Sequence, residues 1–329
     1  MPKLSELGEF GLIARLEKIL PQIPSQKWQV GIGDDCAVRR ISKSRYELIS
    51  QDLLLEGVHF LPGNRRHWES VGWKALAVNL SDIAAMAGSP LGAVIGLGLP
   101  KGAKLADVES VYRGIGMAAK RFACPIVGGD TNLSRRGWVI AVTVLGETRR
   151  SPLLRSGARP GDSLWVTGEL GGAALAWQAE QRKKSLPTAI RTRLSLPMPR
   201  LEWGQRIAAF GKAGALIDVS DGLAGDLGHL VEASRVGFEV MLERIPRPKR
   251  FEALCKKTNI SLEDVLLAGG EDYELLFTIR KGHEAAFVSY CRRWGIQATQ
   301  IGRARKGTTI RWMEGDKALT GKREGFRHF

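Results

Sequence analysis

The stretch Leu91-Gly-Ala-Val-Ile-Gly-Leu-Gly-Leu99 is an uncharged run of nine residues that consists only of apolar side chains and glycines. Such a run is typical of a strand that is buried on both faces, as in a sheet covered by helices. Helical periodicity is found on either side of it, at Trp68–Met86 and at Leu105–Ala123. Helix, strand and helix in this order predict an α/β fold.

The rest of the chain extends this alternation in both directions. Within the first 148 residues we expect a helix at Glu6–Leu20 and strands at Tyr46–Ser50, Pro125–Val127 and Trp138–Leu145. The segment 149–161 is rich in proline, glycine and charge, as domain junctions often are. After it we expect strands near 163–167, 215–219, 238–242, 274–279 and 297–303 and helices near 172–181, 199–210, 221–233 and 284–294. The sequence therefore predicts two α/β domains, residues 1–148 and 149–329.

Composition and charge narrow the class of protein. The chain has 329 residues, a net charge of +15 and four widely spaced cysteines, which disfavours a zinc ribbon or a disulfide framework. We find neither an apolar run of the ~20 residues that a membrane helix needs nor the apolar core of a signal peptide, and we expect a cytoplasmic protein without a membrane partner. The basic residues are scattered and are not interleaved with aromatics, which favours an attraction for anionic substrates over a nucleic-acid partner.

Acidic residues recur beside glycines and at the ends of the expected strands, where α/β sheets usually bind ligands. They are Asp34 and Asp35 in GIGDDC, Asp52, Asp82 in NLSD, Asp130 in GGDT, Asp218 and Asp221 in IDVSDG, and Glu271, Asp272 and Glu274 in GGEDYE. A single one of these motifs is readily explained as a turn or a helix N-cap. Asp82 is harder to explain in this way, because its neighbours are apolar and a buried carboxylate needs a cation or hydrogen bonds. The recurrence of the pattern favours a shared site.

Carboxylates without histidine or cysteine partners favour hard cations, above all Mg²⁺. Glycines that let the backbone approach closely indicate that the ligand of such a site is a polyphosphate. The sequence contains no G-x-x-x-x-G-K-[ST], no protein-kinase H-R-D and D-F-G set and no complete G-x-G-x-x-G. The residues alone therefore predict magnesium-dependent phosphoryl chemistry in which metal ions replace a P-loop lysine.

The order of several motifs resembles that of the thiamine-monophosphate kinase family, which belongs to the aminoimidazole-ribonucleotide-synthetase-like ATP-binding superfamily. The motifs are GIGDDCA, HF, KALAVNLSDIAAMAG, GGDT, RSGARPGD, IDVSDGL and GGEDYELLF, and the likeness extends from Gly8 to Phe329. The resemblance implies the two-domain fold of that superfamily, with an N-terminal ATP- and metal-binding domain that also forms a homodimer. It also implies transfer of a phosphoryl group from ATP to thiamine monophosphate.

The resemblance further implies roles for individual residues. The expected magnesium ligands are Asp35, Ser50, Gln51, Asp52, Asp82, Asp130, Asp218 and Asp221. The expected ATP contacts are Gly129, Asp130, Arg155 and Ser220, and the expected contacts of thiamine monophosphate are His59, Glu271 and Phe326. Gln51 departs from the threonine that the family usually has, although its amide still offers an oxygen ligand. The role of Asp34 is left open.

The implied reaction is direct in-line transfer to an oxygen of the substrate phosphate. A phosphate monoester is largely ionised at pH 7, so we expect no catalytic base. Three alternatives stay open at this point: another ATP-dependent synthetase of the superfamily, a basic nucleic-acid-binding protein, and a nucleotide-binding scaffold without activity. Selenophosphate synthetases usually have a reactive cysteine or selenocysteine near the amino terminus, and Met1–Leu20 contains no cysteine.

Overall fold

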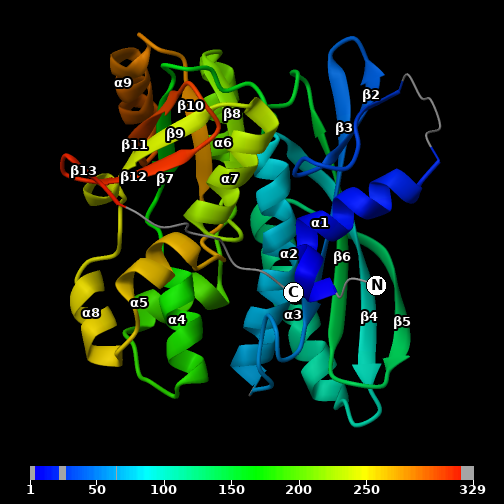
Figure 1. Ribbon diagram of the computed structural model, residues 1–329. Helices are drawn as coiled ribbons and strands as arrows, with labels where there is room; N and C mark the ends of the chain where they lie inside the picture. The colour runs from blue at the N-terminus through cyan, green and yellow to red at the C-terminus, as the bar shows by residue number, and fades with distance from the viewer. Residues whose placement is uncertain (1–3, 22–26, 64, 320–329) are drawn as a thin grey trace.

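The computed structural model describes residues 4–21, 27–63 and 65–319, which form two α/β units, each built on one mixed sheet. Figure 1 shows the sheet of the amino-terminal unit on the right and that of the carboxyl-terminal unit at the upper left. The limits predicted for the two domains lie in the connection between the sheets and stay a prediction. Among the helices of the described residues, none combines the length and the hydrophobicity that a membrane crossing requires.

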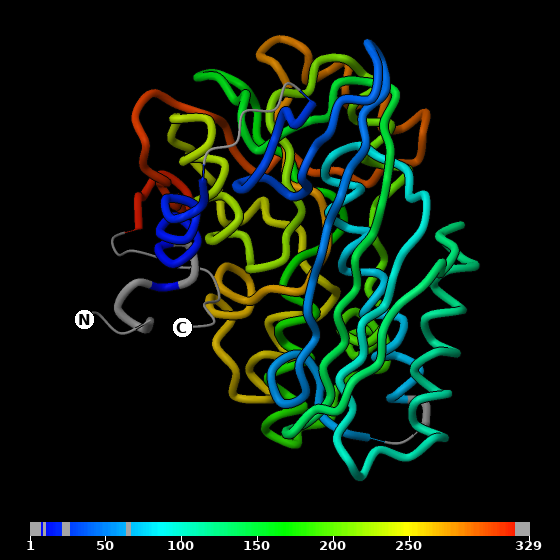
Figure 2. Tube along the Cα trace, turned by 90° about the vertical axis from the view of Figure 1, so that its right-hand side faces the viewer, coloured from blue at the N-terminus to red at the C-terminus, as the bar shows by residue number. Residues whose placement is uncertain are grey.

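Within the described residues the first sheet has six strands in the order β1-β2-β3-β6-β4-β5, and only the β4–β5 pair of these is parallel. The strands are β1 (Trp28–Val30), β2 (Ala37–Ser42), β3 (Arg45–Leu55), β4 (Ser89–Pro100), β5 (Ile126–Ser134) and β6 (Val139–Thr148). Figure 2 shows the long strands of this sheet side by side, with α1 (Leu4–Ile19) to their left. This unit also contains α2 (Arg65–Ala85) and α3 (Leu105–Phe122).

The expectation that 91–99 is buried on both faces is wrong. In β4 the side chains of Ala93, Ile95 and Leu97 belong to the core that α2 and α3 help to form, whereas Gly96 and Gly98 lie on the opposite, partly exposed face. The same alternation in β6 leaves Val139, Ala141, Thr143, Leu145 and Glu147 half-buried on that outer face. One face of the first sheet is therefore packed against helices, and the other is open.

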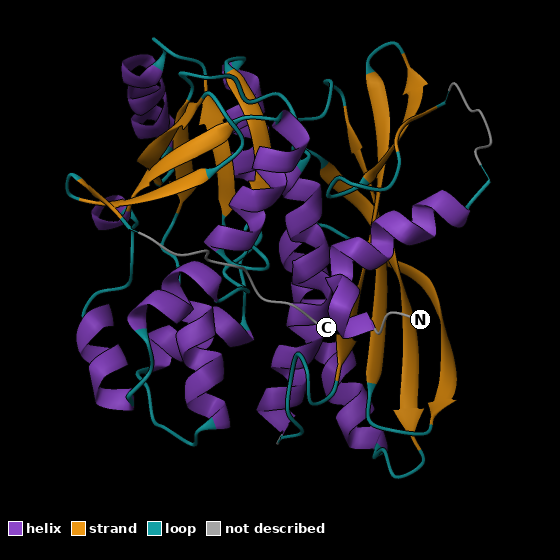
Figure 3. Cartoon of the chain, in the orientation of Figure 1, coloured by secondary structure: helices purple, strands orange, loops and turns teal. Residues whose placement is uncertain are grey.

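The second sheet has seven strands in the order β13-β12-β9-β11-β7-β10-β8, and its only parallel pair among the described strands is β9–β12. The strands are β7 (Ser163–Thr167), β8 (Ala213–Asp218), β9 (Gly237–Met241), β10 (Leu275–Ile279), β11 (Ala298–Arg305), β12 (Ile310–Glu314) and β13 (Lys317–Ala318). The helices are α4 (Gly172–Gln181), α5 (Thr188–Ser195), α6 (Leu201–Phe210), α7 (Leu223–Ser234), α8 (Phe251–Thr258) and α9 (Glu284–Trp294), with short turns at Leu242–Arg244 and Asp264–Ala268. Figure 3 shows α4, α5 and α8 grouped away from the strands.

Both faces of this second sheet are covered, which explains why β7 and β10 are buried at every position. Leu164 and Val166 of β7 join the core that contains α4 and α7, whereas Trp165 between them packs with α6 and α9. Continuous apolar runs are what such a two-sided environment requires. The sequence prediction of a second α/β unit agrees with this arrangement.

Helix α2 lies between the two units and contacts both of them. On one side it crosses α3 so closely that a Cβ added at Gly114 would lie 1.8 Å from the carbonyl oxygen of Glu69. On the other side a Cβ added at Gly204 of α6 would lie 2.1 Å from the carbonyl oxygen of Ala84. Because α2 is enclosed in this way, the polar side chains Lys74, Asn79 and Ser81 on it are buried. Each of them needs a partner inside the protein.

Candidate active site

A cavity of about 1050 Å³ lies where the two units meet. In the amino-terminal unit its walls come from α1, the loop before β2, β3 and α2. Arg155 of the junction adds to them, and the carboxyl-terminal unit contributes α4, the loop between β8 and α7, α7 itself and the segment 268–273. The walls thus include strand ends and loops of both units, which is where ligands of α/β proteins commonly bind.

Three carboxylates from distant parts of the sequence converge on this cavity. Asp35 precedes β2, Asp82 lies on α2 and Asp218 ends β8, and each offers an oxygen within 4.8 Å of the other two. Hydroxyl groups orient two of them: Ser50 Oγ donates to Asp82 Oδ2 at 2.5 Å, and Ser81 Oγ donates to Asp218 Oδ2 at 2.6 Å. We call Asp35, Asp82 and Asp218 the carboxylate cluster.

The carboxylate cluster has too little positive charge around it to keep all its members ionised. Burial, together with the neighbouring acids, raises the pKa of Asp218 to about 8 and that of Asp82 well above the usual range. Burial also raises the pKa of Asp35, although Arg155 opposes that shift. The Oδ2 atom of Asp35 is buried and has no hydrogen-bond partner. An oxygen-only cluster with a buried, unused acceptor fits a hard divalent cation.

Arg155 is the cation that contacts this cluster directly. Its Nε and Nη2 donate to Asp35 Oδ1 at 3.0 and 2.7 Å. Its backbone N–H donates to Asp34, with 3.2 Å between the nitrogen and Oδ2, and Asp34 Oδ1 also accepts the backbone N–H of Asp35 at 3.0 Å. Asp34, whose role the sequence left open, thus connects the GIGDDC turn to the junction, and burial and Asp35 raise its pKa to about 7.

Asp52 on β3 lies at the edge of the carboxylate cluster. Its backbone N–H donates to Asn79 Oδ1 at 3.0 Å, and Ser50 Oγ lies 3.3 Å from the same oxygen. Burial, followed by the charges of Asp221 and Asp35, raises the pKa of Asp52 to about 6. The sequence motif NLSD therefore contributes Asn79 and Ser81 as supports of the site, in addition to the expected Asp82.

A second group of possible ligands lies beside Asp221. Asp221, Asp226 and His229 offer ligand atoms within 4.8 Å of one another, and Asp226 Oδ2 accepts the backbone N–H of Asp221 at 3.2 Å. Burial and then Asp221 raise the pKa of Asp226 well above its usual range, and burial lowers the pKa of His229 to about 4. Sequence reasoning missed Asp226 and His229, although their spacing of three residues on a helix places them on one face.

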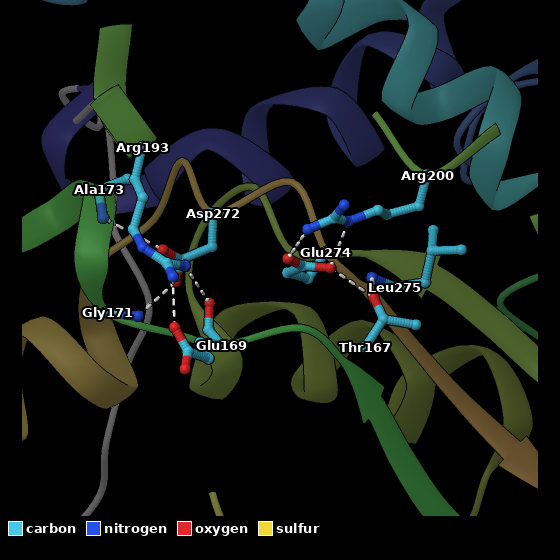
Figure 4. Close-up of polar contacts among 9 residues, drawn as sticks. All are labelled: Thr167, Glu169, Gly171, Ala173, Arg193, Arg200, Asp272, Glu274 and Leu275. Carbon is cyan, nitrogen blue, oxygen red and sulfur yellow. Dashed lines mark hydrogen bonds and ion pairs between the residues drawn. The ribbon is translucent and has the colours of Figure 1, made fainter. Parts of the chain in front are cut away.

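The segment 269–274, which contains the GGEDYE acids, is fixed at several points. Glu271 has a positive φ of 72°, and its backbone N–H donates to the carbonyl oxygen of Ser220 at 2.8 Å. Figure 4 shows the two acids that follow: Asp272 accepts N–H groups of Gly171 and Ala173 at the start of α4, and Glu274 faces Arg200. Backbone strain of this kind persists only where the surroundings hold it.

Of the remaining residues predicted to bind metal or substrate, some line the cavity and one lies outside the described residues. Ser220, Glu271 and His59 line the cavity, whereas Phe326 lies outside the described residues. Gln51 also lines it, but its side chain is on the outer face of the sheet, where its Oε1 accepts from Thr143 Oγ1 at 3.0 Å. The amide of Gln51 thus points away from the carboxylate cluster.

Gly129 and Asp130 are not brought to the carboxylate cluster of the same chain. They lie on β5, the edge strand, and neither lines the cavity. The register aligns Asp130 of β5 with Gly96 of β4, Ala141 of β6 and Leu53 of β3. Because neighbouring strands lie about 4.8 Å apart, these three steps separate Asp130 from β3 by about 14 Å. Asp130 therefore occupies the outer face of the sheet, together with Gln51.

Two family models match the chain. The model "AIR synthase related protein, N-terminal domain" matches residues 33–148, and "AIR synthase related protein, C-terminal domain" matches residues 159–313. The chain therefore belongs to the AIR synthase related proteins, and the predicted fold class of two such domains is confirmed.

Relatives of similar length narrow this class. The thiamine-monophosphate kinase of Aquifex aeolicus is 36% identical over 99% of this chain and 100% of its own, and that of Bacillus subtilis is 32% identical over 98% and 100%. A solved structure described as AaThiL complexed with AMPPCP and TMP has a TM-score of 0.84 at 34% identity, covering 100% of this chain and 99% of that one. The chain belongs to the thiamine-monophosphate kinase family. Escherichia coli HypE, at 18% identity and a TM-score of 0.72, shares the fold alone.

Proposed function

We propose that this protein transfers the γ-phosphoryl group of ATP to the phosphate of thiamine monophosphate, giving thiamine diphosphate and ADP. Membership of the thiamine-monophosphate kinase family supports this reaction, as does the ligand pair in the similar AaThiL structure. The observation on this chain that carries the proposal is the carboxylate cluster, three acids that converge on an interdomain cavity without enough positive charge around them. These relatives do not favour the alternative that the chain is another synthetase of the superfamily or a nucleic-acid-binding protein.

The donor set of the cavity fits Mg²⁺, because it consists of carboxylate and hydroxyl oxygens and includes the unused Oδ2 of Asp35. We propose that the carboxylate cluster holds the ions, with further ligands among Ser50, Gln51, Asp52, Asp130 and Asp221. When bound, Mg²⁺ neutralises phosphate charge and stabilises the transferring phosphoryl group. The backbone carbonyl of Gln51 suits this role better than its side chain, which faces away from the cluster.

The residues of this chain would bind and orient two anionic substrates. Arg155, Ser220 and Gly129 are proposed to contact ATP, and His59, Glu271 and Phe326 to contact thiamine monophosphate. Arg155 reduces the repulsion between the two phosphate groups because its guanidinium already lies at the edge of the cavity. The acceptor oxygen is ionised at pH 7, so no side chain has to remove a proton.

A homodimer explains why Gly129 and Asp130 lie far from the carboxylate cluster of their own chain. Strand β5 is a sheet edge on which Val127 is 64% and Leu133 is 71% exposed, and an exposed apolar edge is a common pairing surface. We propose that two copies associate through the outer faces of their first sheets and that β5 of one copy completes the site of the other. The use of ATP leads us to place the enzyme in the cytoplasm.

The reaction is tested by incubating the purified chain with ATP, Mg²⁺ and thiamine monophosphate and analysing the products by mass spectrometry. We expect thiamine diphosphate and ADP in equal amounts. ADP without thiamine diphosphate, or no turnover by a protein that binds ATP, would reject the substrate assignment.

The shared site is tested by mixing two inactive variants. Asp82→Asn and Asp130→Asn each inactivate, but a mixed dimer keeps one site that combines the native Asp82 of one copy with the native Asp130 of the other. We therefore expect activity to reappear after the variants are unfolded and refolded together. A mixture that refolds as a dimer but stays inactive would show that each chain builds its own site.

A further inference from the structure

Lys74 on α2 is a buried cation that none of the proposed roles includes. Only 4% of it is exposed, and lysines are almost never buried to this extent without a partner. Its Nζ lies 2.5 Å from Glu271 Oε1 and donates a hydrogen bond to the carbonyl oxygen of His59 at 3.0 Å. A single ammonium group therefore joins two residues that are proposed to contact the acceptor substrate.

These two partners come from different units of the protein. His59 lies in the turn after β3 in the amino-terminal unit, and its Nδ1 accepts the backbone N–H of Leu55 at 3.0 Å. Glu271 lies on the segment 269–274 of the carboxyl-terminal unit, where its positive φ makes its conformation dependent on its contacts. Lys74 therefore fixes the turn and the segment relative to each other.

A second cavity meets the first at this point. It has a volume of about 420 Å³, and Lys74 lines it together with Phe60, His67 and Trp177. His59 lines both cavities, whereas Glu271 lines only the larger one. The ion pair between Lys74 and Glu271 thus spans from one cavity to the other beside the turn that contains His59.

We infer that Lys74 is a positioning residue for the acceptor substrate, acting by holding the Glu271 carboxylate and the His59 turn in their binding geometry. This inference rests on the proposed function, because thiamine monophosphate is the ligand assigned to Glu271 and His59. A cation that only joined the two units would affect stability and the binding of both substrates alike. A positioning residue affects the KM for thiamine monophosphate selectively.

The test is steady-state kinetics of Lys74→Met in the full chain at saturating Mg²⁺. Because hydrogen bonds to charged groups contribute more than neutral ones, we expect the KM for thiamine monophosphate to rise about tenfold or more. The KM for ATP should stay within about twofold of the unchanged chain, since Lys74 contacts Glu271 and the carbonyl oxygen of His59, and neither of these residues is proposed to contact ATP. An unchanged KM for thiamine monophosphate, or an equal rise for ATP, would overturn the inference.

Arg280→Met is the matched control, because Arg280 pairs with the buried Asp162 at 2.6 Å and neither residue lines a cavity described above. It should lower the unfolding temperature and leave both KM values unchanged. If it raised the KM for thiamine monophosphate as much as Lys74→Met does, loss of any buried ion pair would explain the effect, and the positioning role would be wrong.

A double variant tests whether Lys74 affects the KM for thiamine monophosphate through Glu271 or by a general loss of structure. It can also be measured if Lys74→Met alone does not fold. Removing both charges in Lys74→Met/Glu271→Gln leaves no unpaired buried ion. We expect its KM for thiamine monophosphate to exceed that of Glu271→Gln by no more than about fivefold, which is the share of the lost hydrogen bond to the His59 carbonyl oxygen. A clearly larger KM would contradict action through Glu271. Absence of thiamine diphosphate formation by the unchanged chain would instead refute the proposed function.

Discussion

The substitution Asp82→Asn is expected to stabilise the metal-free protein while it abolishes catalysis. Burial and the nearby acids raise the pKa of Asp82 well above the usual range, so folding of the metal-free chain favours the protonated form of this carboxyl group. The unfolded chain ionises near pH 3.9, and each pH unit of this difference costs about 1.4 kcal/mol. The cost therefore grows by up to about 1.4 kcal/mol for each pH unit above 3.9, until the pH reaches the raised pKa of the folded state.

Asparagine takes up no proton, and its side-chain oxygen can still accept the hydroxyl of Ser50. The free energy of unfolding in EDTA should thus be higher for Asp82→Asn than for the unchanged chain. The gain should grow as the pH rises from 5 to 7, because a raised folded-state pKa makes folding less favourable with increasing pH. Denaturant titration at pH 5, 6 and 7 measures this trend.

With Mg²⁺ present we expect the opposite order of stability, with Asp82→Asn less stable than the unchanged chain. Asparagine removes one unit of negative charge that would face the cation, and a pair of unit charges about 4 Å apart contributes roughly 4 kcal/mol at an effective dielectric constant near 20. We therefore expect the stabilisation by Mg²⁺ to shrink and turnover to fall about a hundredfold or more. Asp316→Asn, at an exposed position, is the matched control. Unchanged turnover, or a metal-free variant that is less stable than the unchanged chain at pH 7, would refute the reasoning.

Three further outcomes follow from packing and charge. Arg200→Met leaves the buried Glu274 without its ion-pair partner and should lower the free energy of unfolding by about 3 to 5 kcal/mol in urea titrations. Gly114→Ala places a Cβ 1.8 Å from the carbonyl oxygen of Glu69 and should lower the unfolding temperature, whereas Gly116→Ala on the same helix meets nothing within 4 Å and should raise it. Mg²⁺ should raise the unfolding temperature more at pH 8 than at pH 5, because protons compete with the ion for the buried carboxylates; an equal rise at both pH values would contradict a carboxylate site.

The sequence predicted the larger elements of the fold because their hydrophobic patterns are long. The helix expected at Trp68–Met86 is found as α2, and the strand expected at 163–167 is found as β7. Strands such as β2, with the sequence AVRRIS, were missed because a short strand with two adjacent charged residues shows little alternation. The burial of β4 was overestimated, since glycine has no side chain that reports which face is covered.

At the site, too, the residues that a local sequence pattern marks could be predicted and the others could not. The acids of the carboxylate cluster could be found because Asp35 lies in a glycine-rich turn, Asp218 ends a strand and Asp82 stands among apolar residues. Their supports could not, because nothing local marks Ser81 as the donor to Asp218, which lies 137 positions further along the chain. Lys74 also looks like an ordinary surface residue in the sequence, and its burial results from the enclosure of α2 by both units.

Arg155 and Mg²⁺ would compete for the same carboxylate. In this structure the guanidinium takes Oδ1 of Asp35 with two nitrogen atoms, while Oδ2 has no hydrogen-bond partner. A metal ion at Oδ2 would lie close to this guanidinium, and two neighbouring cations repel each other at short range. Binding of an anionic phosphate between them removes that repulsion. The affinities for Mg²⁺ and for the nucleotide should therefore be coupled, each increasing the other, and the Asp35–Arg155 pair is the contact through which this coupling acts.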